Sequence, residues 1–420
     1  MTISTTASAK TPMLADGVSD AYWPGFAALR AIAMLLGIML HSTLAYVSKP
    51  LDGVVWLVTE SSSPICDVLF WWVHAWRIPL FFFLSGFFAK LSMDRHGPAG
   101  FARRRVKRLV IPYFVAVYTI GPALYLVFAV GWYLTGQCTS AQMLPHVPFP
   151  AHIQAQAFGP VHLWFLQDLI IMSIVYLVLS VALGAESQAE DSVKAERLAR
   201  WWMPMIFAVP TGLLLWSDPS PIVAINNTFL VDPSRLLYFS VYFTGGIMAF
   251  QNRTWFRSTT RFAPLHLVLS LPCVALLMFL QNGQVVDTQS LLGRLGLGCT
   301  VAMVAWLTVY GLLGVFLRYL NSEPPTIRYV ADSSYWMYLI HLPVVAALQV
   351  VLSFVELPSF LKFTLVGVTT TVVGLLSYRV LVRDTIIGRY LHGPRTRAVG
   401  DSTASEASST SRLTPPFSSA

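Results

Sequence analysis

Long runs of apolar residues, separated by short polar stretches, dominate this chain. Each run is long enough, or nearly so, to cross a hydrocarbon core of roughly 30 Å as a helix. The expected segments are residues 26–47, 64–89, 109–134, 160–183, 201–217, 235–250, 263–281, 294–317, 329–351 and 360–382. The fifth and sixth are short and are interrupted by Pro204, Pro210 and the pair Gly245 and Gly246. The pattern predicts an all-α polytopic membrane protein with about ten transmembrane helices.

The basic residues of the loops predict the orientation of these helices. The stretch 90–108 holds seven Lys or Arg residues, and further arginines follow in 184–200, in 251–262 and after residue 382. The alternate loops 135–159 and 218–234 hold none. Since Lys and Arg accumulate in cytoplasmic loops, both termini are expected in the cytoplasm. An odd number of spans would break this alternation.

Composition excludes most other classes of protein. Of 420 residues, 55% are hydrophobic and only 11% are charged, whereas a soluble domain carries about a quarter charged residues. The net charge of +8 does not indicate nucleic-acid binding, because the basic residues flank the predicted spans. Four cysteines are too few for a disulfide framework, although Cys66 and Cys138 fall on the same predicted side and a pairing between them stays open.

The predicted domain organisation is a single membrane unit between two tails. Residues 1–22 are polar and rich in Ser and Thr, without a convincing signal-peptide cleavage site, and are expected to form a disordered cytoplasmic tail. Residues 23–385 form the membrane domain. Residues 386–420 are expected to be cytoplasmic and largely disordered, because they contain too little apolar surface to fold.

Ionisable side chains inside predicted spans are few, and such residues mark functional sites by default. Arg30 and His41 are eleven residues apart, which returns to within about 20° of the same helix face. His74 and Arg77 are one turn apart on the second segment, at a similar predicted depth to His41. Further ones are Asp67, His162, Asp168, His266 and His341. His266 is interpreted as a packing residue, and His162 fits either an interfacial or a functional role.

These residue types suit acyl transfer from a phosphorylated donor. A neutral histidine in a water-poor site can take a proton from a hydroxyl group. Guanidinium groups bind phosphates, so Arg30, Arg105 and Arg108 could hold a donor such as acyl-coenzyme A at the cytoplasmic surface while His41 lies deeper. An anion or proton transporter remains an alternative. No His pair has the spacing of a helical metal site, and no metal is expected.

Several short patches then carry a family resemblance. Arg30 and His41 match an Arg-x10-His signature in the first segment, and Arg105 and Arg108 match an Arg-x-x-Arg element before Pro112. Further patches are His74-Ala75-Trp76-Arg77, Phe82-Phe83-Leu84-Ser85-Gly86-Phe87-Phe88, His162-Leu163-Trp164-Phe165-Leu166 and Tyr335-Trp336-Met337-Tyr338-Leu339-Ile340-His341. In this order, across about residues 20–385, they resemble the membrane acyltransferase-3 family, with the glucan succinyltransferase group nearest in pattern.

The resemblance implies a ten-helix enzyme of the bacterial inner membrane. It would move a succinyl or acetyl group from cytoplasmic acyl-coenzyme A, a co-substrate rather than a bound cofactor, to a hydroxyl of an extracytoplasmic glycan such as periplasmic glucan. It implies that His41 is the essential histidine, as a base or as an acyl carrier, and that Arg30, Arg105 and Arg108 bind the donor. Candidates for the substrate pocket are His74, Arg77, His162, Trp164, Asp168 and His341. A succinyl donor would favour a cationic partner for its distal carboxylate, for which Arg77 is a candidate.

The acceptor and the class of activity stay open at this point. The same family acylates O-antigens, exopolysaccharides and lipids, and proteins of glycan synthesis are candidate partners. A glycan exporter or a non-catalytic subunit of a polysaccharide machine would use a similar membrane domain. A covalent change in the acceptor separates an acyltransferase from either of these.

Overall fold

The computed structural model describes residues 23–49, 55–143, 150–154, 159–184, 201–215, 227–252, 256, 260–281, 290–320 and 324–388, and no strand occurs among them. The long helices are α1 (Pro24–Thr43), α2 (Pro64–Arg105), α3 (Ile111–Leu134), α5 (Trp164–Ala182), α7 (Met203–Leu214), α8 (Pro233–Gln251), α10 (Ala263–Gln281), α11 (Leu291–Tyr319), α12 (Pro325–Ser353) and α13 (Ser359–Ser377). Short elements are the π-helices η1 (Val106–Val110) and η4 (Tyr378–Val382), the 3-10 helices η2 (Ser140–Met143) and η3 (Val161–Leu163), and the helix α4 (Ala151–Gln154). The all-α fold class is confirmed.

Each predicted apolar segment coincides with one long helix. Within the described ranges, seven helical stretches are long and apolar enough to cross a membrane, and one of these, Pro64–Leu134, includes both α2 and α3. The helix α7 is apolar but only 12 residues long, and α8 is not among the seven stretches. The protein is therefore a multi-pass membrane protein, while a total of ten spans stays a prediction. The predicted tail 1–22 lies outside the described residues, and the tail 386–420 is described only to Gly388.

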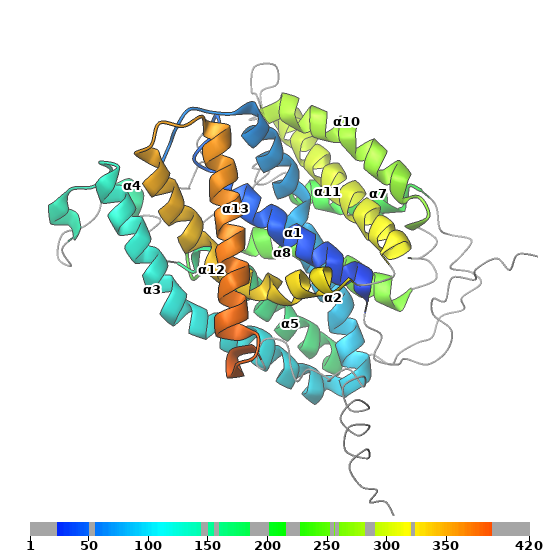
Figure 1. Ribbon diagram of the computed structural model, residues 1–420. Coiled ribbons are helices and arrows are strands. Elements are labelled where there is room, and N and C mark those ends of the chain that lie inside the picture. The colour runs from blue at the N-terminus through cyan, green and yellow to red at the C-terminus, as the bar shows by residue number, and fades with distance from the viewer. Residues whose placement is uncertain are drawn as a thin grey trace, which may run out of the picture.

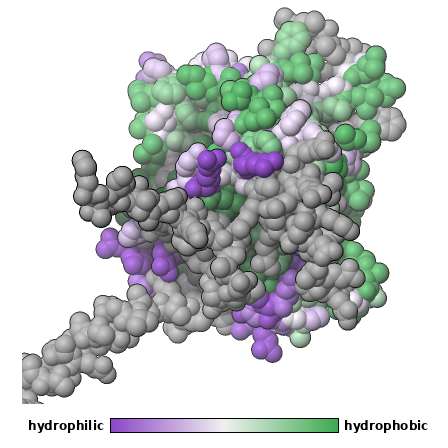
Figure 2. All heavy atoms as spheres, turned by 90° about the vertical axis from the view of Figure 1, so that its right-hand side faces the viewer, coloured by the Kyte–Doolittle hydropathy of each residue, from purple (hydrophilic) through white to green (hydrophobic). Residues whose placement is uncertain are grey.

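The surface is that of a protein surrounded by lipid. Large apolar side chains are widely exposed, as at Leu126, Leu183 and Leu271, which are 65%, 76% and 64% exposed. Figure 2 shows hydrophobic side chains over much of one face, with hydrophilic ones gathered in a few groups. A soluble monomer rarely exposes so much contiguous apolar surface. These side chains instead suit the hydrocarbon region, where helices satisfy all backbone hydrogen bonds internally.

The helix α1 runs through the middle of the bundle, with α3 and α10 on its outer sides (Figure 1). It packs against α2, α11, α12 and α13. The helices α2 and α8 also pack closely against each other. Their backbones approach so closely that a methyl group added at Gly86 or Gly246 would overlap the backbone of the other helix. The sequence suggested that Gly245 and Gly246 interrupt the sixth segment, which is wrong: α8 continues through both, and they permit close helix packing.

The basic stretch 90–108 is helical rather than an extended loop. The helix α2 continues to Arg105 across a break at Gly97, whose φ of +64° is readily adopted only by glycine, and η1 then leads into α3. The arginines near 105 are consequently fixed on a rigid element. Cys66 and Cys138 are both buried, and their thiols are free, so no disulfide joins them.

Candidate functional site

A cavity of about 750 Å³ extends along α1 and is also lined by α2, η1, α3, η3, α5, α8 and α12. Among the described residues, seven arginines and no carboxylate line it. The arginines are Arg30, Arg77, Arg95, Arg104, Arg105, Arg108 and Arg235. Apolar and aromatic side chains form most of the remaining wall. The cavity therefore suits a long ligand that carries negative charge and has a slender, less polar part.

The helix α1 supplies Arg30 and His41 to the same cavity, as their common face predicted. Arg30 is exposed near the beginning of α1, and His41 is half-buried near its end. Their separation of eleven residues corresponds to about 16 Å along the helix axis. One ligand can thus contact both residues only if it is elongated.

Two further histidines meet His41 from other elements. The His41 and His341 rings are 5.1 Å apart between centroids, and the His341 and His162 rings are 5.4 Å apart. His341 comes from α12 and His162 from η3. The Nδ1 atoms of His41 and His162 and the Nε2 atom of His341 are buried without a hydrogen-bond partner in the described part of the chain. All three histidines line the cavity, and these nitrogens lack a hydrogen-bond partner among the described residues.

A proline helps to set the hydrogen bonds of this cluster. Pro343 has no N–H group, so the carbonyl of Leu339, four residues earlier in α12, lacks its usual helical donor. The Nε2 atom of His162 lies 3.0 Å from that carbonyl oxygen, and His341 Nδ1 lies 2.7 Å from the Tyr338 carbonyl oxygen. Because a carbonyl only accepts, each of these nitrogens donates. In the neutral rings, the opposite nitrogens carry the lone pairs.

The backbone before His162 adopts an unusual conformation. Val161 has a φ of +47°, which is rare for a β-branched residue and costs roughly 1–3 kcal/mol. Its N–H donates to Asn227 Oδ1 at 2.8 Å, and the adjoining Gly159 N–H donates to the Tyr125 hydroxyl at 3.0 Å. The Tyr338 hydroxyl donates to the His162 carbonyl at 2.7 Å. The surrounding structure therefore holds His162 in place from three directions.

The arginine-rich end of the cavity is also built on a proline. Pro112 leaves the Arg108 carbonyl without its helical donor, and the Tyr335 hydroxyl donates to that oxygen at 3.0 Å. Arg105 lies over the Phe101 ring at 5.1 Å and donates to the Ser85 carbonyl at 3.3 Å. The structure thus places Arg30, Arg105 and Arg108 around one end of the cavity that contains His41.

The second helix contributes His74 and Arg77. The Arg77 side chain is 8% exposed and lies against α1 at Gly37, where an added methyl group would overlap the guanidinium. No ion pair or hydrogen bond joins this guanidinium to any other described residue, and its Nε is buried without a partner. His74 lines the same cavity and stacks on Phe70, with 5.5 Å between ring centroids.

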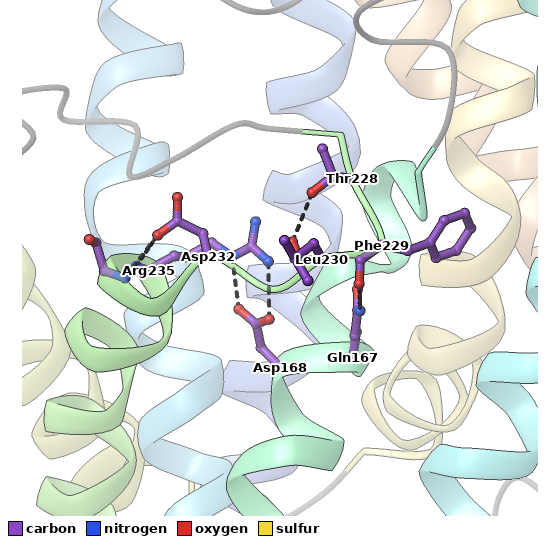
Figure 3. Close-up of polar contacts among 8 residues, drawn as sticks. Gln167, Asp168, Thr228, Phe229, Leu230, Asp232 and Arg235 are labelled. Atoms are coloured by element: carbon purple, nitrogen blue, oxygen red, sulfur yellow. Dashed lines mark hydrogen bonds and ion pairs between the residues drawn. The ribbon is translucent and has the colours of Figure 1, made fainter.

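Asp168 is not among the residues that line the cavity, although its partner Arg235 is, and its role in a substrate pocket stays a prediction. Its carboxylate is fully buried and forms a bidentate ion pair with Arg235 of α8, at 2.9 and 3.1 Å (Figure 3). Arg235 also lies 4.8 Å from the Trp164 ring, which does line the cavity as predicted. Asp232 caps α8 by accepting from the Ser234 N–H at 2.8 Å, and Gln167 donates to the Phe229 carbonyl at 2.7 Å beside it.

Sequence reasoning missed Arg235, the first residue of the predicted sixth segment. A signal for it existed, since a lone carboxylate in an apolar helix requires a cationic partner. His266 fits the packing interpretation: it is fully buried outside the cavity, and its Nε2 donates to the Trp201 carbonyl at 2.8 Å.

Comparison with known proteins assigns the chain to a family. An acyltransferase domain model, the acyltransferase-3 type, matches residues 23–379. This chain belongs to the acyltransferase-3 family. The match covers all of the long helices from α1 to α13, so the membrane domain as a whole is an acyltransferase.

Curated relatives agree with this membership. The chain is 24% identical over 328 residues to "Glucans biosynthesis protein C" of Escherichia coli O157:H7 and of Escherichia coli K12. Each alignment covers 75% of this chain and 80% of the relative. No solved structure matches the chain.

Proposed function

We propose that this acyltransferase moves a succinyl or acetyl group from cytoplasmic acyl-coenzyme A to a hydroxyl group of an extracytoplasmic glycan, such as a periplasmic glucan, at the bacterial inner membrane. The observation that carries the proposal is the single cavity that joins the end around Arg30, Arg105 and Arg108 to His41. The E. coli relatives named for glucan biosynthesis favour a glucan as the acceptor.

The donor would lie along the length of this cavity. Its nucleotide phosphates would contact the guanidinium groups of Arg30, Arg105 and Arg108, which bind phosphate oxygens in bidentate fashion. The slender pantetheine arm would then carry the thioester past the apolar wall towards His41. An arm of this kind suits the roughly 16 Å between Arg30 and His41 along α1.

His41 would act as the general base. A ring nitrogen of His41 takes the proton of the acceptor hydroxyl, and the hydroxyl oxygen attacks the thioester carbon. The carbon–sulfur bond then breaks, and the thiolate of coenzyme A leaves and recovers the proton. The His341 and His162 rings beside His41 carry lone pairs on Nε2 and Nδ1, which can accept hydrogen bonds from acceptor hydroxyl groups.

The test is mass spectrometry of periplasmic and surface glycans from cells with and without the gene, complemented by the wild type or by His41→Ala. We expect a gain of about 100 Da for succinyl or about 42 Da for acetyl that only the wild type restores. His266→Gln, which changes a buried histidine outside the cavity, is the matched control and should retain the modification. Glycans with no covalent change in any strain would contradict acyl transfer and favour an exporter.

A further inference from the structure

The guanidinium of Arg77 lies inside the cavity with no negatively charged neighbour. It is more than nine-tenths buried, and no carboxylate, carbonyl or hydroxyl of the described residues accepts a hydrogen bond from it. The ionisable groups that interact with it electrostatically are His41, His74, His341 and the Tyr338 hydroxyl, and none of them is a carboxylate. An isolated buried cation is strongly unfavourable unless something else neutralises it.

The fold makes room for this charge beside the reacting centre. The guanidinium lies where a side chain on Gly37 would be, so glycine at that position permits the contact. Gly37 and His41 are four residues apart on one face of α1, about 6 Å along the helix axis. Any anion bound by Arg77 therefore lies one helical turn from His41.

We infer that Arg77 binds the distal carboxylate of the acyl group and selects donors whose acyl chain ends in a negative charge; this inference rests on the acyl transfer proposed above. The two carbonyl carbons of a succinyl group are three carbon–carbon bonds apart, about 4 Å when extended. A carboxylate on so short a linker can reach the guanidinium at Gly37 while the thioester carbon lies beside His41. An acetyl group would leave the buried charge unneutralised.

A matched pair of donors tests this directly, because succinyl- and butyryl-coenzyme A have the same number of acyl carbons and differ in charge. Binding of both, and of free coenzyme A, is measured on the full chain in detergent or nanodiscs. The wild type should bind succinyl-coenzyme A about tenfold or more tightly than the butyryl compound, as expected for a charge-assisted hydrogen bond. Equal binding of the two donors by the wild type would overturn the inference.

Arg77→Met assigns any preference to this side chain, because methionine fills the same space up to the guanidinium. The variant should lose the preference for succinyl over butyryl while its affinity for free coenzyme A stays unchanged. Arg77→Lys, which keeps a positive charge, should retain part of the preference and serves if the methionine variant does not fold. A preference that survives in Arg77→Met would overturn the inference. An equal loss of affinity for both donors would also overturn it, because Arg77 would then contact a part of the donor that the two compounds share.

The same measurements separate this inference from the proposed function. Binding of coenzyme A with a preference for uncharged acyl groups, together with a glycan gain of about 42 Da, would keep acyl transfer and reject the carboxylate site. No binding of any coenzyme A compound and no change in glycan mass would reject both.

Discussion

Two buried arginines contact the same cavity, and they differ in what neutralises them. Arg235 is 2% exposed and its guanidinium is held by both oxygens of Asp168, from the neighbouring helix α5. Arg77 is 8% exposed and has no acidic partner within the described chain. Arg235 joins the helices α5 and α8 through its ion pair. Arg77 instead lies against Gly37 of α1 and lines the cavity.

Under the inference above, one residue type serves structure at Arg235 and ligand binding at Arg77. A buried ion pair with good geometry is satisfied within the chain, so it needs no ligand and fixes the positions of its helices. A buried cation without a partner lowers the stability of the ligand-free protein, and binding of an anion removes that cost. The following substitutions test this distinction.

Breaking the ion pair should have the largest effect on stability. Asp168→Asn leaves the Arg235 guanidinium buried beside a neutral amide, and we expect a loss of about 3–5 kcal/mol. The measurement is the apparent unfolding temperature in detergent, together with the yield of folded protein. The double variant Asp168→Leu with Arg235→Met removes both charges and should recover most of the loss. A double variant as unstable as Asp168→Asn would show that the charges themselves are needed.

Filling the space at Gly37 should have the next largest effect. Gly37→Ala forces the Arg77 guanidinium, the flexible end of its side chain, to shift within the cavity, with an expected loss of up to about 1 kcal/mol of stability. The loss should disappear in the Arg77→Met background, because the overlapping atoms are then absent. Gly296→Ala on α11, where an added methyl group meets nothing, is the control and should be neutral or slightly stabilising. Additive effects of Gly37→Ala and Arg77→Met would show that the two positions are not coupled.

The arginines at the end of the cavity should behave differently from both buried ones. Arg108 is exposed, and Arg108→Gln should raise the KM for acyl-coenzyme A by about tenfold while stability hardly changes. A short thioester donor without the nucleotide, such as an acyl-N-acetylcysteamine, makes no phosphate contact and should show no such increase. Equal increases for both donors would mean that Arg108 does not contact the phosphates.

The membrane fold could be predicted from sequence because apolar length and loop charge reflect the bilayer directly. Each apolar segment became one helix, and Arg30 and His41 reached one cavity because helical periodicity fixes their common face. Pairing between helices could not be predicted in the same way. Asp168 was predicted as a pocket residue because it is a carboxylate inside a predicted span. Its partner, Arg235, is 67 residues away on a helix whose neighbours depend on packing at Gly86 and Gly246.

Removing the unpaired arginine should change stability far less than breaking the ion pair, and in the opposite direction. Arg77→Met deletes a buried charge that has no partner in the described chain, so the unfolding free energy of the empty protein should rise, by about 1 kcal/mol. The contrast appears when a ligand is added. Saturating succinyl-coenzyme A at about 100 times its dissociation constant should stabilise the wild type by about 2.7 kcal/mol. The same concentration should stabilise the variant less, because the acyl carboxylate has lost its partner. A loss as large as that of Asp168→Asn in the empty protein would place Arg77 with Arg235, as a structural residue.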